Sequence, residues 1–394
     1  MPLLLHLSDV HLGARHADMG AAAVKQRERQ LAAFSRAIDE GLARKVDAVL
    51  ICGDLFDSNA QPRRSVERAV DELRRLTEAG IRVVIIPGTH DVYDGRSIFR
   101  AFDLASMASL PRGSDLLTVL TPEQPELLLG DLDLIIYGRV FATKRAPHSP
   151  LQGFDVRGDP RASWKVAMIH GSRHIPGKVD DDDVLFTDAE VAASGLDYLA
   201  LGHWHSFQSG QAGETTWCYP GAPEPVAVDQ DGAGDVCLVS LEDGAGGHSS
   251  VRIERIRVGR TVFRAIDFDA SELTSQDELE RRIAAMAGPD LILGVTIAGV
   301  APDSLEILPD EVERRLAESF LQLRITDRSV SEPGAALDLP PDTVAGRFVL
   351  DVGARLRAAE AQGDAASAEA EQARQVLRLG RRLLLDDPDH VTLA

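Results

Sequence analysis

The chain has 394 residues, 44% of them hydrophobic and 26% charged, a composition typical of a soluble globular protein with room for two or three domains. Its formal net charge of −20 argues against a nucleic-acid binder, because affinity for phosphate comes from Lys and Arg. A local basic track with bound cations can still make one cleft attractive to nucleic acid. No apolar run approaches the roughly 20 residues that span a bilayer, which excludes a transmembrane helix.

The N-terminal stretch MPLLLHLSDVHLG lacks a basic start, and His6 interrupts its short apolar run. It therefore predicts a strand and not a signal peptide. The three cysteines, Cys52, Cys218 and Cys237, are far apart and form no CxxC pair. They predict a cytoplasmic protein with neither a disulfide framework nor a zinc–thiolate site.

The first 90 residues alternate between buried strands and amphipathic helices. Strands are predicted for LLLHLSD, VDAVLICGD and IRVVIIPG, and apolar residues three or four apart predict helices over 25–43 and 64–79. This alternation predicts parallel strands joined by right-handed crossovers. Polar residues that follow the strands should then meet at one edge of the sheet, where open α/β sheets bind ligands.

From about residue 115 to 260, predicted strands follow one another with few helices between them. The candidates are LLTVL, LDLIIYG, WKVAMIHG, LDYLALGHWH, TTWCYPG, DVCLVSL and SVRIERIRV. We expect these strands to form a second sheet packed on the first. Residues 1–260 are therefore predicted to form one two-sheet domain.

A change in composition after the two-sheet domain predicts a smaller unit. It is predicted to be a small α+β cap domain over 261–328. Its predicted elements alternate between strand and helix, in the order VFRAIDFD, SQDELERRIAAMAG, LILGVTIAGV, PDEVERRLAESF and LQLRITD. The first of these helices begins with a predicted capping box from Ser275 to Glu278. Residues 329–342 are predicted to be a linker and 343–394 a helical segment. The Arg and Leu residues of that segment fit either a helix lying on the body of the protein or a docking element for a partner.

Residues that commonly bind metals follow predicted strands in five places along the chain, as D-x-H, GD-x-x-D, G-x-H-D, H-G and G-H-x-H. They are Asp9, His11, Asp54, Thr89, His90, Asp91, His170, His203 and His205. One such residue alone is usually structural, but five of the eleven histidines follow apolar strands beside Gly, Asp or Thr. Carboxylate and imidazole ligands without thiolate suit ions such as Mn²⁺. A bridging carboxylate can hold two such ions about 3.5–4 Å apart, the spacing for displacement at phosphorus.

In their order along the chain, these motifs resemble the calcineurin-like metallophosphoesterase superfamily. HLSDVHLG, GDLFDS, DYLALGHWH and YPGAPEP are most similar to its DNA-repair nuclease branch, which holds the nuclease subunit of bacterial SbcCD and its archaeal and eukaryotic double-strand-break repair counterparts. The similarity covers about residues 3–225. It implies a four-layer α/β/β/α sandwich of two packed mixed sheets, to which the small α+β cap domain and the C-terminal helical segment are added.

The resemblance also implies a ligand set for two divalent ions. One ion would be bound by Asp9, His11 and His205, the second by His170, His203 and Thr89, and Asp54 would bridge the two. The expected ion is Mn²⁺, with Mg²⁺, Fe²⁺ and Zn²⁺ as alternatives. A hydroxide between the ions would attack the phosphodiester.

The remaining implied roles concern protons and substrate. His90 would protonate the leaving oxygen or steady the transition state, oriented by the carboxylate of Asp57 or Asp91. Arg15 and Arg173 are candidates for contacts with substrate phosphate, although ordinary solvated charge explains both equally well.

The chain departs from the family motif at Thr89, where the family has asparagine. A threonine hydroxyl is shorter than an amide side chain and is a weaker ligand. We favour an interpretation in which Thr89 binds the second ion directly or through water. A second alternative is that this ion binds weakly. A third is that the site is degraded and the protein is a binding subunit. Retention of the other ligands, with His90, argues against the last alternative.

These features predict a hydrolase: a manganese-dependent DNA nuclease, an exonuclease with a further single-strand endonuclease action, working in DNA repair beside an SMC-like ATPase of the SbcC type. One alternative is a phosphatase or phosphodiesterase acting on a small molecule, which the net charge favours. The other is a DNA- or ATPase-binding subunit with a weakened site. The cap domain and YPGAPEP favour the nuclease. A homodimer is compatible with the sequence, and no membrane partner is expected.

Overall fold

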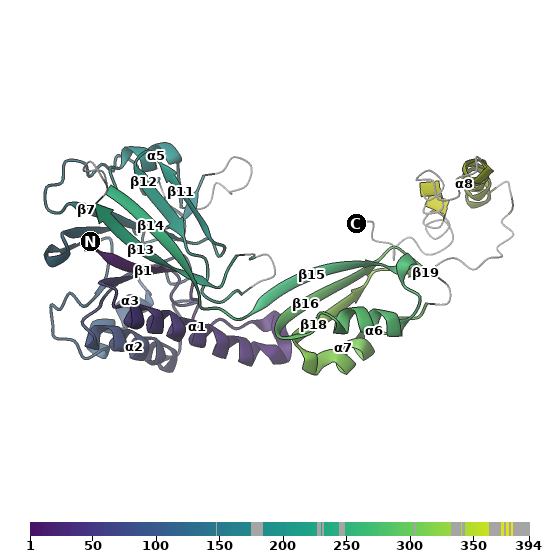
Figure 1. Ribbon diagram of the computed structural model, residues 1–394, viewed down its shortest axis with the longest axis horizontal. Coiled ribbons are helices and arrows are strands. Elements are labelled where there is room, and N and C mark those ends of the chain that lie inside the picture. The colour runs from purple at the N-terminus through teal and green to yellow at the C-terminus, as the bar shows by residue number, and fades with distance from the viewer. Residues whose placement is uncertain are drawn as a thin grey trace. The chain divides into compact units, whose positions relative to one another are not determined.

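The chain forms two compact units, Met1–Val262 and Phe263–Ala394 (Figure 1). The computed structural model describes residues 1–146, 148–174, 184–226, 230, 232–243, 249–302, 305–331, 340, 343–361, 372–373, 376–377 and 380. None of the described helices is long and apolar enough to cross a membrane.

Two six-stranded sheets make up the first unit, with the orders β14-β13-β1-β2-β3-β4 and β11-β12-β10-β7-β6-β5. The strands of the first sheet are β1 (Leu3–Leu7), β2 (Ala48–Cys52), β3 (Arg82–Ile86), β4 (Leu117–Val119), β13 (Asp235–Asp243) and β14 (Ser249–Arg257). The strands of the second sheet are β5 (Glu126–Leu129), β6 (Leu134–Gly138), β7 (Trp164–His170), β10 (Tyr198–Gly202), β11 (Gln208–Ala212) and β12 (Thr215–Tyr219).

Helices and short segments complete the first unit. The helices are α1 (Ala23–Arg44), α2 (Arg63–Glu78), α3 (Ile98–Ala101), α4 (Leu104–Met107) and α5 (Asp188–Ala193). The short strands are β8 (Ser172–Arg173) and β9 (Leu185–Phe186), and the 3-10 turns are Ala17–Ala22 and Gly130–Leu132. The predicted alternation of strand and helix in the first 90 residues is confirmed, because β1, β2 and β3 pair in parallel with α1 and α2 between them.

Alternating side chains of the strands build a layered core. Leu5 and Ile51 pack with Phe34 of α1 on one face of the first sheet. Leu50, on the opposite face, belongs to a core shared with Met168 of the second sheet. The outer face of the second sheet packs against α5 through a further cluster of buried side chains. Helices therefore cover both outer faces, as Figure 1 shows, and the expected four-layer α/β/β/α sandwich is confirmed.

The strands after residue 115 do not all join the second sheet, and this part of the expectation is wrong. β4 lies beside β3, while β13 pairs antiparallel with β1 and then with β14, all in the first sheet. An apolar strand pattern records burial but not the neighbour that provides it. The strands β5 and β11 were not predicted, and the sequence of β11, QSGQA, has no apolar run.

The second unit contains a three-stranded sheet with the order β15-β16-β18. Its main elements are β15 (Val262–Asp269), α6 (Gln276–Ala284), β16 (Gly288–Ala298), α7 (Pro309–Leu316) and β18 (Phe320–Asp327), with 3-10 turns at Ala270–Glu272 and Ala317–Ser319. These are the predicted strands and helices of the cap. Ser275 accepts a hydrogen bond from the N–H of Glu278 at 3.2 Å, but the Glu278 carboxylate accepts from Thr274 instead of closing the predicted capping box.

The predicted linker contains a short strand near its start. β19 (Val330–Ser331) pairs in parallel with β17 (Val300–Ala301), and residues 332–339 and 341–342 of the predicted linker lie outside the described residues. The first helix of the C-terminal segment is observed as α8 (Val344–Ala361). The second predicted helix lies almost entirely outside the described residues.

Candidate metal centre

Loops that follow five parallel strands meet at one edge of the two sheets. The N–H of His11 donates to the carbonyl oxygen of Asp54 at 2.9 Å, which ties the loop after β1 to the loop after β2. The N–H of His90, after β3, donates to Oδ1 of Asp54 at 2.7 Å. The N–H of His203, after β10, donates to both carboxylate oxygens of Asp9 at 3.1 Å. The predicted convergence of these loops is confirmed.

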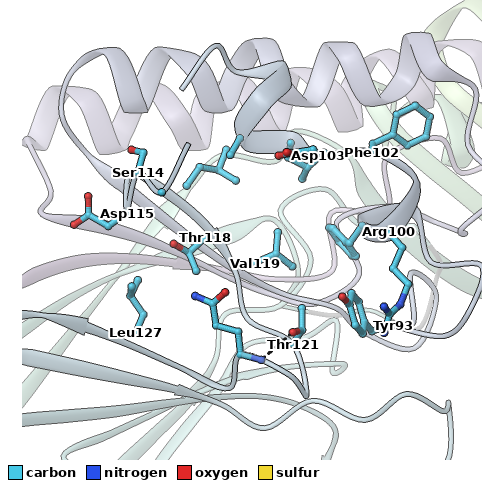
Figure 2. A pocket seen from close by; sticks show the side chains of 16 residues that line it. Tyr93, Arg100, Phe102, Asp103, Ser114, Asp115, Thr118, Val119, Thr121 and Leu127 are labelled. Atoms are coloured by element: carbon cyan, nitrogen blue, oxygen red, sulfur yellow. Dashed lines mark hydrogen bonds between the residues drawn. The ribbon is translucent and has the colours of Figure 1, made fainter. Parts of the chain in front are cut away.

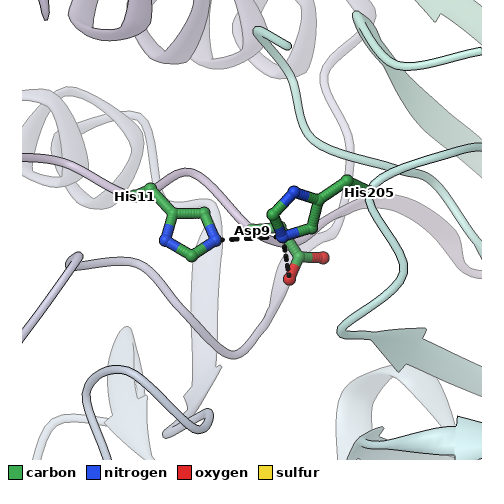
Figure 3. A group of neighbouring side chains, drawn as sticks. All are labelled: Asp9, His11 and His205. Atoms are coloured by element: carbon green, nitrogen blue, oxygen red, sulfur yellow. Dashed lines mark hydrogen bonds and ion pairs between the residues drawn. The ribbon is translucent and has the colours of Figure 1, made fainter. Parts of the chain in front are cut away.

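Asp9, His11 and His205 form the first group of ligand atoms. Figure 3 shows that His11 and His205, which are 194 residues apart in the chain, lie close to each other and to the carboxylate of Asp9. His11 Nε2 lies 3.2 Å from His205 Nε2, and His205 Nε2 lies 3.7 Å from Asp9 Oδ1. One ligand atom from each residue lies within 4.8 Å of the others. This donor set, one carboxylate and two imidazoles, suits a divalent transition-metal ion.

The carboxylate of Asp54 lies between the first group and a second one. Its Oδ2 is 3.8 Å from His11 Nε2 and 3.1 Å from His170 Nε2. Asp9, Asp54 and His170 also satisfy the geometry of a metal-ligand group. Asp54 therefore occupies the position that a bridging ligand between two ions requires.

His170 is oriented so that Nε2 faces the cluster. Its Nδ1–H donates to the carbonyl oxygen of Cys52 at 2.9 Å, which leaves the lone pair on Nε2. That Nε2 is buried and faces Oδ2 of Asp54 at 3.1 Å. Burial lowers the pKa of His170, but the Asp54 carboxylate outweighs burial and raises this pKa to about 10. A divalent cation would replace the proton in this pair, so the residues fit a metal ion.

Thr89 and His203 lie beside the second group. The Thr89 hydroxyl donates to Oδ2 of Asp54 at 3.4 Å. The ring of His203 packs on the ring of His170 with the centroids 5.2 Å apart. Both side chains are therefore near Asp54 and His170, and their role as ligands stays a prediction.

Of the two carboxylates expected to orient His90, that of Asp57 lies within ion-pair distance of its ring, and that of Asp91 binds backbone N–H groups. His90 Nδ1–H donates to the backbone carbonyl of Asp57 at 2.9 Å, whereas the Asp57 carboxylate is 3.8 Å from that nitrogen and 3.4 Å from Nδ1 of His11. The Asp91 carboxylate accepts from the N–H groups of Gly88 and Phe56. Asp57 thus holds His90 through its backbone, and Asp91 ties the loops after β2 and β3 together.

Asp91 is completely buried close to the cluster. Burial, followed by the negative charge of Asp54, raises the pKa of Asp91 to about 7. Its two backbone hydrogen bonds oppose this rise. Asp91 therefore binds the backbone of two site loops, and its role in orienting His90 stays a prediction.

The backbone at the cluster takes conformations that side chains normally avoid. Positive φ angles occur at Asp9 (54°), His11 (51°), Asp54 (51°) and His203 (103°). Non-glycine residues adopt this region at a cost in free energy, and such residues concentrate at functional sites. The hydrogen bonds between the loops compensate that cost and fix the directions of the ligands.

Glycines let the loops approach one another. A Cβ atom at Gly202 would lie 1.8 Å from the carbonyl oxygen of Cys52, and a Cβ at Gly88 would lie 2.3 Å from Oδ1 of Asp54. Neither position can accept a larger residue without displacing a strand end or the Asp54 carboxylate. The glycines of the motifs are therefore required by packing around the ligands.

The two candidate substrate arginines differ in their surroundings. Arg173 donates to the carboxylate of Asp188 at 2.9 Å and stacks over the ring of Trp217 at 4.6 Å. Its charge is therefore already compensated within the protein. The side chain of Arg15 is exposed, and its backbone carbonyl accepts a hydrogen bond from Arg27.

Several residues that orient ligands were missed in the sequence. Ser8 donates to Oδ2 of Asp9 at 2.5 Å, and the Gln230 amide lies 2.6 Å from Nδ1 of His205. Ser8 adjoins a motif and carried a usable signal, because hydroxyls commonly hold ligating carboxylates. Gln230 lies 25 residues after His205, outside every motif, and nothing in the sequence marks it.

A cavity of about 490 Å³ lies elsewhere in the first unit, between α3, α4 and β4 (Figure 2). Its 16 lining residues include none of the ligand residues described above. Arg100, on its wall, stacks over Tyr93 at 4.0 Å and pairs with Glu123. The cavity therefore contains none of the candidate metal ligands, and the candidate active site is the cluster around Asp54.

The chain is similar in sequence to proteins named as DNA-repair proteins and to a metallophosphoesterase. The DNA double-strand break repair protein Mre11 of Aeropyrum pernix is 29% identical over 282 residues, which cover 69% of this chain and 64% of that protein. The protein of the same name from Halobacterium salinarum is 25% identical over 403 residues, covering 99% and 96%. The uncharacterized metallophosphoesterase YhaO of Bacillus subtilis is 26% identical over 352 residues, covering 83% and 82%.

The family is assigned by a match that covers more than half of the chain. Residues 2–207 match the calcineurin-like phosphoesterases, and this segment contains every residue of the two ligand groups. Enzymes of this kind use divalent metal ions to hydrolyse phosphoester bonds, which agrees with the donor set at Asp54. The chain belongs to the calcineurin-like phosphoesterase family and is a hydrolase acting on phosphoester bonds.

Proposed function

We propose that this chain is a metal-dependent DNA nuclease that acts in DNA repair, as an exonuclease with a further endonuclease action on single strands. The observation that carries the proposal is the position of Asp54, between His11 and His170, which suits a bridge between two ions. Relatives named for double-strand break repair support DNA as the substrate, one of them along almost the whole chain.

The ligands of the two ions would come from both groups and from the side chains beside them. They would be Asp9, His11, Asp54, Thr89, His170, His203 and His205. When bound, the ions would supply an ionised water as nucleophile and stabilise charge on the phosphoryl oxygens. We propose Mn²⁺, because imidazole-rich sets with carboxylates suit it better than Mg²⁺.

His90 would handle the proton of the leaving group. Its Nδ1–H is held by the carbonyl oxygen of Asp57, so Nε2 is the nitrogen that can carry a proton to the substrate. Its side chain is 48% exposed, which leaves it accessible to a phosphodiester at the cluster. The T-shaped contact with His11, with ring centroids 4.7 Å apart, keeps His90 beside the first group of ligands.

Degradation of labelled single- and double-stranded DNA in Mn²⁺ tests the proposal, with bis(p-nitrophenyl) phosphate as the small-molecule comparison. His90→Ala should lower turnover of DNA by about 10²–10⁴-fold and leave Mn²⁺ binding unchanged. That variant also separates true activity from a contaminating nuclease. Hydrolysis of the small ester without cleavage of either DNA would overturn the proposal.

An SMC-like ATPase is the proposed partner, bound through residues 343–394. Support comes from α8, which leaves Val344 78% and Leu350 49% exposed. Deletion of 343–394 should abolish co-purification with such an ATPase and leave cleavage of bis(p-nitrophenyl) phosphate intact. Loss of both would indicate misfolding, and intact co-purification would refute the role of this segment.

A second candidate is a phosphodiesterase acting on a small molecule. The net charge of −20 favours it, because an acidic surface repels the DNA backbone. The same substrate comparison decides between the two candidates. A third candidate, a binding subunit with a weakened site, predicts DNA binding without hydrolysis of either substrate.

A further inference from the structure

Trp204 occupies the position between the two histidines of the GHWH motif. Its indole Nε1–H donates to the hydroxyl of Ser172 at 3.0 Å. Its ring also packs against Tyr219, with the centroids 6.4 Å apart. The side chain stays partly exposed, although it joins the apolar cluster on the outer face of the second sheet. A large aromatic ring is thus held rigidly beside two proposed metal ligands.

The backbone that presents this ring is itself anchored to the cluster. His203, which precedes Trp204, has φ of 103°, and its N–H donates to the carboxylate of Asp9. Ser172, which receives the indole N–H, lies two residues after His170. Trp204 is therefore tied by its indole to the segment after His170 and by its backbone neighbour to Asp9.

Trp204 is the accessible member of an aromatic series. Tyr219 and Trp217 continue the series, with their ring centroids 6.2 Å apart, and Arg173 stacks over Trp217. Tyr219 is 1% exposed and Trp217 is 6% exposed, so neither can offer a face to a ligand. Tyr219 packs against Trp204, and Trp204 is the one of these three rings that keeps exposed surface for stacking.

Charge also favours stacking over phosphate contacts here. The chain carries a net charge of −20, and Arg173, the basic residue at the end of the aromatic series, is already paired with Asp188. A nucleic acid approaching this surface gains little from counterion release. Stacking of a nucleobase on an aromatic ring needs no phosphate contact and tolerates any base sequence, because every base has a π-face.

We propose that Trp204 stacks on an unpaired nucleobase next to the phosphodiester held at the metal centre, and so selects single-stranded or frayed DNA ends. This inference rests on the proposed nuclease function. It adds a specificity-determining contact to a site whose other proposed groups act on phosphate. A paired base is already stacked in its duplex, so the same ring would favour ends that have opened.

The test uses the full chain with His90→Ala, in Mn²⁺, so that DNA is bound but not consumed. Binding of a ten-residue oligothymidylate is compared with binding of the same oligonucleotide whose bases are replaced by abasic sites. The natural oligonucleotide should bind about tenfold more tightly or better, and this ratio should persist as salt is raised. Trp204→Ala should bring the ratio close to one, and Trp204→Phe should keep part of it.

Two further measurements separate stacking from a merely structural role. Tryptophan fluorescence should be quenched by oligothymidylate but not by the abasic strand, and Trp204→Phe should lose this quenching. Tyr93→Ala, which removes a partly buried aromatic ring at the separate cavity, serves as the matched control and should keep the base-to-abasic ratio. Mn²⁺ binding, measured by electron paramagnetic resonance, should be unchanged in Trp204→Phe.

The outcomes are distinct. A base-to-abasic ratio that survives in Trp204→Ala overturns the stacking proposal and leaves the nuclease function intact. Loss of Mn²⁺ binding in Trp204→Phe also overturns it, because Trp204 then acts by positioning His203 and His205. If the native chain neither binds nor cuts any DNA but hydrolyses bis(p-nitrophenyl) phosphate, the nuclease function fails and the stacking role fails with it.

Discussion

The carboxylate of Asp57 lies 3.4 Å from Nδ1 of His11, on the side of the imidazole that faces away from the cluster. The hydrogen bond to His11 lowers the pKa of Asp57, so the carboxylate stays ionised beside the ring. An ionised carboxylate at Nδ1 makes Nε2 a more basic ligand and fixes its direction. The backbone carbonyl of the same Asp57 holds His90. Asp57 thus contacts the proposed ligand His11 through its carboxylate and the proposed proton donor His90 through its backbone carbonyl oxygen.

Asp57→Asn should weaken binding of the first Mn²⁺ ion by about 10–100-fold, because the amide cannot supply the negative charge beside His11. The carbonyl oxygen that holds His90 is retained in this variant. Isothermal titration calorimetry measures the affinity, with His90→Ala as the control that should bind Mn²⁺ normally. Normal Mn²⁺ affinity combined with lost turnover would show that the carboxylate acts on His90 instead.

Thr89→Asn should tighten binding of the second Mn²⁺ ion. An asparagine amide oxygen reaches one bond further than the Thr89 hydroxyl, which now donates to Asp54 at 3.4 Å, and it is a better neutral ligand. Thr89→Ser keeps the hydroxyl and should show no gain. Titration calorimetry of the three proteins measures the two affinities. Two equally tight ions in the native chain, with no change in Thr89→Asn, would contradict the expectation.

Gly202→Ala should destabilise the fold by about 1–3 kcal/mol or more, because the added Cβ would lie 1.8 Å from the carbonyl oxygen of Cys52 and 2.9 Å from Nδ1 of His170. That displacement breaks the hydrogen bond that orients His170, so Mn²⁺ affinity should fall as well. Gly158→Ala is the matched control, since nothing lies within 4 Å of its Cβ. Urea unfolding measures the change in stability, and equal effects of the two variants would count against the packing argument.

Stability without metal should depend on pH through His170. Asp54 raises the pKa of His170 from 6.5 to about 10 in the folded chain. A raised pKa contributes stability that is complete below about 6.5 and is lost as pH rises through about 10. In the presence of a chelator, the free energy of unfolding should therefore fall between pH 7 and 10 as this contribution disappears.

The pH effect has two controls. His170→Gln should remove the part of the decline that belongs to this ring, and Mn²⁺ should suppress it because a cation replaces the proton. Urea titrations at several pH values measure the native chain with and without Mn²⁺ and the His170→Gln variant. A decline of the same size in His170→Gln would assign it to other groups.

Much of the fold could be predicted from local patterns. The apolar runs around Leu5 and Ile51 and the helical spacing of Phe34 and Ile38 produced the expected strands and α1, because burial and periodicity follow from residue order. Convergence of the polar loops could be predicted too. Parallel strands such as β1, β2 and β3 end at the same edge of a sheet, so residues directly after them meet.

The sequence by itself thus determined the layered architecture and the residue types gathered at one edge. Only the tertiary structure decided which atoms face each other: the carbonyl oxygen of Cys52 meets His170 across 118 residues, and Asp57 serves His11 by its side chain and His90 by its backbone. It also decided that β13 joins β1 in the first sheet. Local propensity reports burial and period, whereas these contacts depend on long-range packing and on uncommon backbone angles, such as φ of 103° at His203, that no residue type specifies alone.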